Sequence, residues 1–545
     1  MLLKLADLFQ YFSVVLRAGT LVFQSLLLGG VLFVFWTGRA SSDVPHKSID
    51  RVQTSTWRLL RASALCLAAV QLSYLYANSA VLMATAEIGL DQVIGANFFI
   101  AGCVVLTAAL ATATIGRGSN KLTKWLLPAL TAIIMAGSAM TNHAASRLDG
   151  RPLLITLSCI HELATGFWIG GLPFLVLGLC RAEDAATRWY VTGRFSKIAL
   201  VSVGALVISG TVMSGLFVGS WAALFGTAYG VMVTAKAVML GAILLLGGVN
   251  FLLIRNASNG DALPLLRRLI EVELGIGITV ILTAASLTSQ PPAIDQISNI
   301  VTMAQISRRL RPAMPRLMFS PVAEAASIGG EAPREAASGA SLRAYNADGV
   351  PLTPRQINGA IESELNHHWT GLVVLAMGLF ALLARTGKAS WAEYWPLLLI
   401  GIAGFIFLRA DPECWPLGWK GFGACWADPE VFQHRIAALV CVVFAVFEAR
   451  ARKQRRETDP LALVFPMMTA FGGAVLLTHS HAITNVKENL LVELNHVPMG
   501  IIAVFAGWAR WLELRLPQKY SAVPSWIWPV CFVLIGALLL NYREM

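Results

Sequence analysis

Apolar stretches of about twenty residues recur along the whole chain and are separated by short polar segments. A helix of that length is just long enough to cross the hydrocarbon core of a bilayer. The 545 residues are 56% hydrophobic and only 13% charged, which is too apolar for a soluble protein of this size. The sequence therefore predicts an all-α fold, a polytopic membrane helix bundle.

The apolar runs predict about fourteen transmembrane helices, allowing one more or one fewer. Eight lie near 12–36, 61–86, 93–116, 123–142, 153–180, 196–218, 229–254 and 268–290. Six more lie near 367–385, 393–409, 432–449, 461–479, 489–509 and 524–541.

The formal net charge of +11 would favour nucleic-acid binding in a soluble protein, but here it reports topology, so no nucleic-acid partner is expected. Lys and Arg gather in alternate loops, and such loops face the cytoplasm. Both chain termini are therefore predicted to be periplasmic. The first span contains Arg17, is too long for a signal peptide and is interpreted as a retained helix. The Lys/Arg-rich loops are 38–61, 116–124, 181–197, 255–268, 385–392, 450–459 and 510–520.

The spans divide the chain into three parts. Residues 1–290 form an eight-span membrane block with short connections. Residues 291–366 are rich in Arg, Pro, Ala, Ser and Gly and poor in large apolar residues, so they are interpreted as a periplasmic connector with one amphipathic helix near 295–311. Residues 367–545 form a second, six-span block that is rich in histidine.

With this topology every histidine except His46 lies on or near the outer side of the membrane. The gathering of imidazoles at one face of a hydrophobic chain is interpreted as presenting them to a metal ion or a haem. The outward histidines are His143, His161, His367, His368, His434, His479, His481 and His496.

In the first block, His161 and Glu162 lie about 13 Å deep in the fifth span, where ionisable groups usually face a partner or a water-filled path. His143 has Met140 one helical turn before it, and a thioether with an imidazole suits copper, particularly Cu(I). The alternative for His161 is a histidine satisfied by an interhelical hydrogen bond, and for His143 an ordinary interfacial residue. Gly166, Gly170 and Gly171 have the small-residue spacing that lets another helix approach closely.

Lys236 lies inside the seventh span, where a bare ammonium group is costly unless it pairs or snorkels. Glu162 lies at a similar depth on the fifth span and is the first choice of partner. Glu273, approaching from the cytoplasmic side, is the second choice, and snorkelling alone is the alternative to both.

The second block carries histidines at the outer ends of several spans. His367 and His368 open the ninth span, and His434 opens the eleventh. His479 and His481 cannot share one face of a regular helix, so their use as paired ligands requires the twelfth span to end there. Glu493 lies one turn before His496 and could orient it as an acceptor. The alternative is that these are separate interfacial histidines.

Cys414 and Cys425 share one outward loop, where an oxidising compartment favours a disulfide over a thiolate metal site. The other six cysteines lie in or beside spans and are interpreted as small apolar packing residues.

Several of these residues resemble the copper resistance protein D (CopD) family, in its long form with an additional C-terminal block. The resemblance is closest over 194–292, which contains "RFSKIALVSVGALVISGTVMSG", "FGTAYGVMVTAKAVML" and "LLRRLIEVELGIGITVILTAASLTSQPP". Upstream, His161 precedes Trp168-Ile169-Gly170-Gly171, and the second block contributes "NHHWTGL", "DPEVFQHR" and "LLTHSHAITNVKENLLVELNHVPMG". The family features within 194–292 are Phe195-Ser196, Gly210, Thr227, Tyr229-Gly230, Lys236, Asn250, Glu273 and Pro291-Pro292.

The resemblance implies copper transport at the bacterial inner membrane, from the periplasm toward the cytoplasm. It also implies a separate periplasmic copper-binding protein of the CopC type as a donor, because the connector contains no histidine before His367. The metal sites would then be formed by the outward histidines with Met140 and Glu162. Membrane lipid is the expected surrounding, and no enzymatic activity is expected.

Two other functions fit the same residues. Histidines on different helices, such as His434, His479 and His496, could be axial ligands of a b-type haem in an electron-transfer protein. A copper-binding sensor or assembly factor that does not transport the metal is the other alternative. The sequence contains no evident Walker A motif or phosphorylated-aspartate loop, which argues against an ATP-driven pump.

Overall fold

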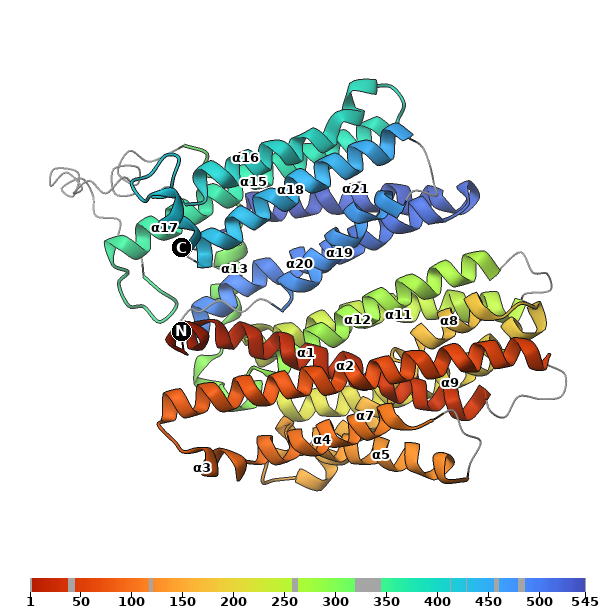
Figure 1. The fold of residues 1–545 in the computed structure, drawn as a ribbon. Coiled ribbons are helices and arrows are strands. Elements are labelled where there is room, and N and C mark those ends of the chain that lie inside the picture. Colours follow the sequence, from red (N-terminus) through yellow and green to blue (C-terminus); the bar gives the residue numbers. More distant parts are fainter. Residues whose placement is uncertain are drawn as a thin grey trace. The chain divides into compact units, whose positions relative to one another are not determined.

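The computed structural model describes residues 2–37, 45–116, 121–256, 263–318, 345–411, 413–427, 429–454, 460–478 and 486–544. These residues are almost entirely helical, and their extended pairing is limited to two isolated β-bridges (Figure 1). The chain divides into two compact units. Unit 1 is Met1–Leu224, Met232–Ile297 and Thr478–Ser480, and unit 2 is Phe225–Val231, Ser298–Leu477 and His481–Met545.

Eleven helices in the described residues are long and apolar enough to cross a membrane, and two shorter apolar helices, Trp125–Ala139 and Pro460–Leu476, accompany them. The predicted all-α membrane bundle is therefore confirmed. The number fourteen, the placement of both termini and the three-part division at residues 290 and 366 remain predictions.

Unit 1 contains long helices that pack against one another, with the pairs α1 and α2, α2 and α4, and α7 and α9 in most extensive contact. The α1 helix also packs against α7 and α12. The helices are α1 (Leu2–Thr37), α2 (His46–Ala86), α4 (Asn97–Thr114), α5 (Lys121–Ala139), α7 (Arg151–Trp168), α8 (Leu172–Arg181), α9 (Ala185–Val218), α11 (Ala228–Asn256) and α12 (Leu263–Thr288), with the short α3 (Leu90–Ile94), α6 (His143–Ser146) and α10 (Trp221–Gly226).

At the junction of α7 and α8, glycines let the α1 helix approach closely. A Cβ atom on Gly170 would lie 1.9 Å from the carbonyl oxygen of Ser25 in α1, and one on Gly166 would lie 2.6 Å from the Leu28 side chain. Only glycine permits so close an approach of two helices. The predicted use of these small residues is therefore confirmed, and α1 is the helix that approaches.

Unit 2 is organised around the pairs α15 and α21, α19 and α20, and α20 and α21. Its helices are α13 (Met303–Leu310), α15 (Pro354–Arg385), α16 (Leu398–Arg409), α17 (Phe422–Ala427), α18 (Pro429–Gln454), α19 (Val464–Leu476), α20 (Val486–Arg515) and α21 (Gln518–Leu540), with the 3-10 turns η5 (Ser390–Leu397) and η6 (Pro460–Leu463).

The α15 helix begins at Pro354, well before the start predicted at residue 367. Thr353 and Gln356 form a reciprocal capping box, and Pro354 occupies the first turn. These residues satisfy the free backbone N–H groups at the helix start. Polar residues that precede the apolar run therefore extend the helix beyond the bilayer-spanning part.

Candidate metal site

His161 of α7 is held by α9. Its Nδ1 lies 3.1 Å from Ser209 Oγ, and the Ser209 hydroxyl donates to the carbonyl of Ala205 at 2.7 Å. Because a hydroxyl has one hydrogen, Ser209 accepts from His161 Nδ1–H, and the lone pair of the neutral ring is on Nε2. A Cβ atom on Gly210 would lie 3.1 Å from His161 Cε1, so the glycine leaves room for the imidazole. This tautomer is the one that binds a metal through Nε2.

Glu162 lies in a separate polar network. Gln24 Nε2 donates to Glu162 Oε2 at 3.0 Å, and the hydroxyl groups of Ser138 and Ser158 donate to the carboxylate at 3.2 and 3.4 Å. Gln24 also lies 3.5 Å from the sulfur of Met135. Three neutral donors from α1, α5 and α7 therefore surround one membrane-buried carboxylate.

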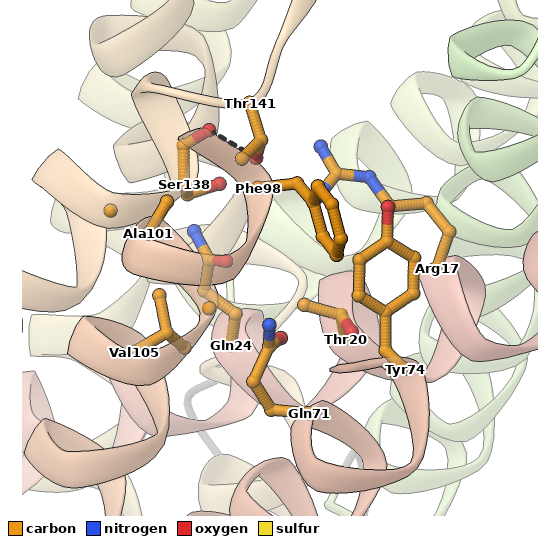
Figure 2. A pocket seen from close by; sticks show the side chains of 12 residues that line it. Arg17, Thr20, Gln24, Gln71, Tyr74, Phe98, Ala101, Val105, Ser138 and Thr141 are labelled. Atoms are coloured by element: carbon orange, nitrogen blue, oxygen red, sulfur yellow. Dashed lines mark hydrogen bonds between the residues drawn. The ribbon is translucent and has the colours of Figure 1, made fainter. Parts of the chain in front are cut away.

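A small polar cavity of about 20 Å³ adjoins this network, between α1, α2, α4 and α5. Figure 2 shows the side chains of Arg17, Tyr74 and Phe98 at one side of the cavity and the amides of Gln24 and Gln71 at the other. A space of this size holds about one water molecule, provided that polar partners line it. The cavity is therefore a candidate water site inside the membrane-spanning part of unit 1.

The sequence predicted that His143 and Met140 share a helix face, but in the structure they do not. The α5 helix ends at Ala139, and Asn142 caps the new helix α6 that begins at His143, so the expected one-turn spacing is interrupted. Met140 is 47% exposed, whereas Nε2 of His143 is buried without a hydrogen-bond partner among the described residues. Burial and the positive charge of Arg17 lower the pKa of His143 below its usual value, which keeps the imidazole neutral.

The predicted Glu162–Lys236 ion pair is not found among the ion pairs of the described residues. Glu162 is instead satisfied by Gln24, Ser138 and Ser158. The second choice of partner, Glu273, accepts hydrogen bonds from Trp168 Nε1 at 2.8 Å and from Asn250 Nδ2 at 2.7 Å. Both carboxylates are therefore stabilised by neutral donors from other helices, which the spacing of charges along the sequence could not indicate.

In unit 2, His367 of α15 and His496 of α20 come together with Tyr542. The ring centroids of the two histidines are 5.9 Å apart, and those of His367 and Tyr542 are 3.9 Å apart in a stacked arrangement. His367 Nδ1 donates to the Ser363 carbonyl at 2.7 Å, and His496 Nδ1 donates to the Val492 carbonyl at 2.9 Å. Because a carbonyl can only accept, both neutral rings carry their lone pair on Nε2.

His368 is the neighbour of His367 but has a different role. Its Nδ1 accepts from the backbone N–H of Arg316 at 2.8 Å, and its Nε2 donates to the Tyr542 carbonyl at 2.9 Å. The side chain is 1% exposed. Both ring nitrogens join the connector and the C-terminal segment to α15, and the prediction of His368 as a metal ligand stays a prediction.

His434 at the start of α18 is oriented by a carboxylate. Its Nδ1 lies 2.8 Å from Asp411 Oδ1, and its side chain is 37% exposed. A carboxylate that accepts from one imidazole nitrogen directs the other nitrogen toward a metal in many metalloproteins. Glu493, which was predicted to orient His496, accepts instead from Asn489 at 3.4 Å, whereas His496 Nδ1 donates to the backbone carbonyl of Val492.

His479 and His481 lie outside the described residues. Over the described ranges, no three His, Cys, Asp or Glu side chains are grouped so that they could hold a metal ion. The structure thus brings together His367 and His496, and it holds His161 and His434 with other partners. Metal sites formed by the outward histidines, as one composite site or two separate sites, stay a prediction.

Cys414 and Cys425 are buried together with Val431 as free thiols. Burial and the neighbouring Cys425 raise the pKa of Cys414 to about 12. The two residues therefore meet inside their loop, and the disulfide between them remains a prediction.

Sequence reasoning missed several residues that the structure places at these sites. Asp411 was not predicted as a site residue, although an acidic residue at the end of the span before His434 is a usable signal. Tyr542 was not singled out, because no local pattern connects the last residues of the chain to His367. Gln24 lies within an apolar span, where a single amide is a sign of an interhelical hydrogen bond, and Asn250 was indicated only through the family resemblance.

The fold, with its long apolar helices, defines a multi-pass membrane protein that carries buried polar groups and histidines inside its helical units. Residues 189–287 match the protein family described as Copper resistance protein D (CopD), so the predicted resemblance is confirmed over this segment. The matched segment includes α11, most of α9 and almost all of α12, and with them Ser209, Gly210, Asn250 and Glu273.

The chain is also similar to the copper transport protein CutJ of Bacillus subtilis (strain 168), with 33% identity over 161 residues. The alignment covers 29% of this chain and 29% of that relative. No solved structure matches the chain.

Proposed function

We propose that this protein transports copper across the bacterial inner membrane, from the periplasm toward the cytoplasm. The observation that carries the proposal is the setting of His161. Ser209 and Gly210, which hold this imidazole, belong to the segment that matches the CopD family. The name of the similar relative supports copper as the transported ion.

The histidine pair of unit 2 supplies a second copper site in this proposal. A metal ion about 2 Å from each of two imidazole nitrogens separates the ring centroids by about 6 Å. The separation of His367 and His496 is 5.9 Å, which supports a shared ion. Two nitrogen ligands suffice for Cu(I), and His434 with Asp411 would serve as a separate point of capture. A separate periplasmic protein of the CopC type would deliver the ion.

Copper uptake into vesicles tests this function. Purified protein reconstituted into liposomes should accumulate copper, and His161→Ala should lower the initial rate by tenfold or more, whereas His46→Ala should leave it unchanged. His46 is the matched control because it is exposed at the start of α2. Copper binding without uptake would support the sensor or assembly-factor alternative, and a Soret band stoichiometric with protein would support the haem alternative.

A further inference from the structure

A groove of about 240 Å³ opens in unit 1 between α7, α8, α9, α11 and α12. Its walls are mostly apolar and include Phe195 and Phe251, of which Phe251 is 40% exposed. Its polar part consists of Trp168, Asn250 and Glu273, with Thr192 and Ser196. By the positive-inside prediction, this groove lies in the cytoplasmic half of the membrane.

Glu273 and Asn250 are deep within this groove. Each is 4% exposed, and Glu273 lies about 15 Å along α12 from the helix start. Both carboxylate oxygens of Glu273 have a donor, Trp168 Nε1–H on one and Asn250 Nδ2–H on the other. Asn250 Oδ1 is buried and has no hydrogen-bond partner among the described residues. A buried amide oxygen without a donor is energetically costly, so it indicates a second arrangement.

No charged side chain of the described residues compensates Glu273. The Glu273 side chain is buried and accepts hydrogen bonds from Trp168 and Asn250, and no neighbouring charged group among the described residues acts on it. The ionisable groups on the helices around it include Arg17 on α1, Arg151, His161 and Glu162 on α7, Arg181 on α8, Arg188, Arg194 and Lys197 on α9, and Lys236 and Arg255 on α11. On its own helix, Arg267 and Arg268 pair with Glu271 instead.

The Asn250 amide can serve both protonation states of the carboxyl group. In the present arrangement its NH₂ group donates to the carboxylate. Turned over by 180°, its Oδ1 would accept the O–H of a protonated Glu273 at the same contact, where the two heavy atoms are 2.7 Å apart. Gly247 leaves space beside the carboxyl group, because a Cβ there would lie 3.7 Å from Oε1.

We propose that Glu273 is a proton-binding site that opens into this groove and couples proton movement to copper movement. The Asn250 amide forms a hydrogen bond with Glu273 in both of its protonation states. The coupling part rests on the proposed transport function, whereas the binding of a proton to Glu273 does not. Protonation adds one proton to a carboxylate oxygen, and the amide turns over to accept it. Deprotonation through the groove reverses both changes.

Infrared difference spectroscopy of the purified protein tests the proton site without transport. Glu273→Gln should remove one carboxylic-acid C=O band that is lost from the wild type at alkaline pH. The matched control is Glu271→Gln, which should remove no such band, because Glu271 is ion-paired with Arg267 and Arg268. Asn250→Leu should shift the midpoint of the Glu273 band to higher pH, since the carboxylate loses a donor. Spectra of Glu273→Gln that retain every carboxylic-acid band of the wild type would overturn the proposal.

Copper uptake under an imposed pH difference tests the coupling. For one proton per copper ion, one pH unit should change the steady-state copper ratio about tenfold in wild type and in Glu271→Gln. Glu273→Gln should show no such dependence. If wild type takes up copper regardless of the pH difference, the coupling is wrong and the transport function stands. If wild type takes up no copper, the transport function and the coupling both fail, and the infrared result alone decides the proton site.

Discussion

At the scale of single residues, the hydrogen bond of one ring nitrogen decides whether a histidine of this protein can bind a metal. His161, His367 and His496 each donate from Nδ1 and keep the lone pair on Nε2. His368, which follows His367 in the chain, forms hydrogen bonds to the backbone with both of its ring nitrogens. The same side chain therefore serves as a ligand candidate at one position and as a structural tie at the next.

We expect His367→Ala and His496→Ala each to weaken copper binding by tenfold or more, a loss of about 1.4 kcal/mol or greater. The reason is that each removes one of two nitrogens proposed to share the ion. Isothermal titration of purified protein with Cu(I) measures the change. A double variant that binds copper with wild-type affinity would show that the pair is structural.

His368→Ala should instead destabilise unit 2 by about 1–3 kcal/mol, because it leaves the backbone N–H of Arg316 and the buried carbonyl of Tyr542 without this partner. Thermal unfolding in detergent measures the loss, and His46→Ala is the control. A stable His368→Ala protein with reduced copper affinity would contradict the structural role.

His143 should make the folded protein lose stability as the pH falls. Its folded-state pKa is lowered, so as the pH falls below about 6.5 the unfolded chain takes up a proton that the folded chain does not. This contribution to stability is thus present above the unfolded pKa and is lost as the pH falls. Between about pH 7 and about pH 5, the melting temperature should fall more for wild type than for His143→Gln. Equal falls in both proteins would show that His143 is freely protonated.

At the scale of elements, close helix contacts fix the positions of the buried polar groups. Gly170 at the junction of α7 and α8 lies against the backbone of Ser25, one residue after Gln24 on α1. The contact holds α1 at the distance where Gln24 reaches Glu162. A glycine in a helix contact thus determines the surroundings of a carboxylate two turns away.

Gly170→Ala should therefore destabilise unit 1 by at least about 1–3 kcal/mol, since the added Cβ would lie 1.9 Å from a carbonyl oxygen. The control is Gly204→Ala in α9, where a Cβ meets nothing within 4 Å. Melting temperatures in detergent compare the two. Equal stability of both variants would mean that α1 does not approach as closely as described.

Cys414 and Cys425 lie in one loop and are predicted to form a disulfide. A disulfide closing so short a loop should contribute about 2–3 kcal/mol, so reduction should lower the unfolding free energy by that amount. Cys180→Ser, an exposed cysteine at the end of α8, is the control. Mass mapping that finds both thiols free in protein from an oxidising compartment would refute the pairing.

At the scale of the whole molecule, the distribution of Lys and Arg predicts the topology. Reporter fusions after residue 340 and at the C-terminus should both report a periplasmic location. A cytoplasmic result at either site would place the outward histidines on the wrong side and would reverse the proposed direction of copper movement.

The apolar runs predicted the fold class and the approximate helix positions, because bilayer thickness imposes long apolar segments that are visible without a structure. The quoted motifs predicted the CopD resemblance, and the histidine positions indicated His161, His367 and His496 as candidate ligands. The hydrogen-bond partners of these groups became visible only in the packed helices. The hydrogen bond between Gln24 and Glu162 joins residues 138 positions apart, and His368 connects to Tyr542 across 174 positions. Such contacts depend on how helices pack side by side, and residue spacing within any one helix carries no record of that packing.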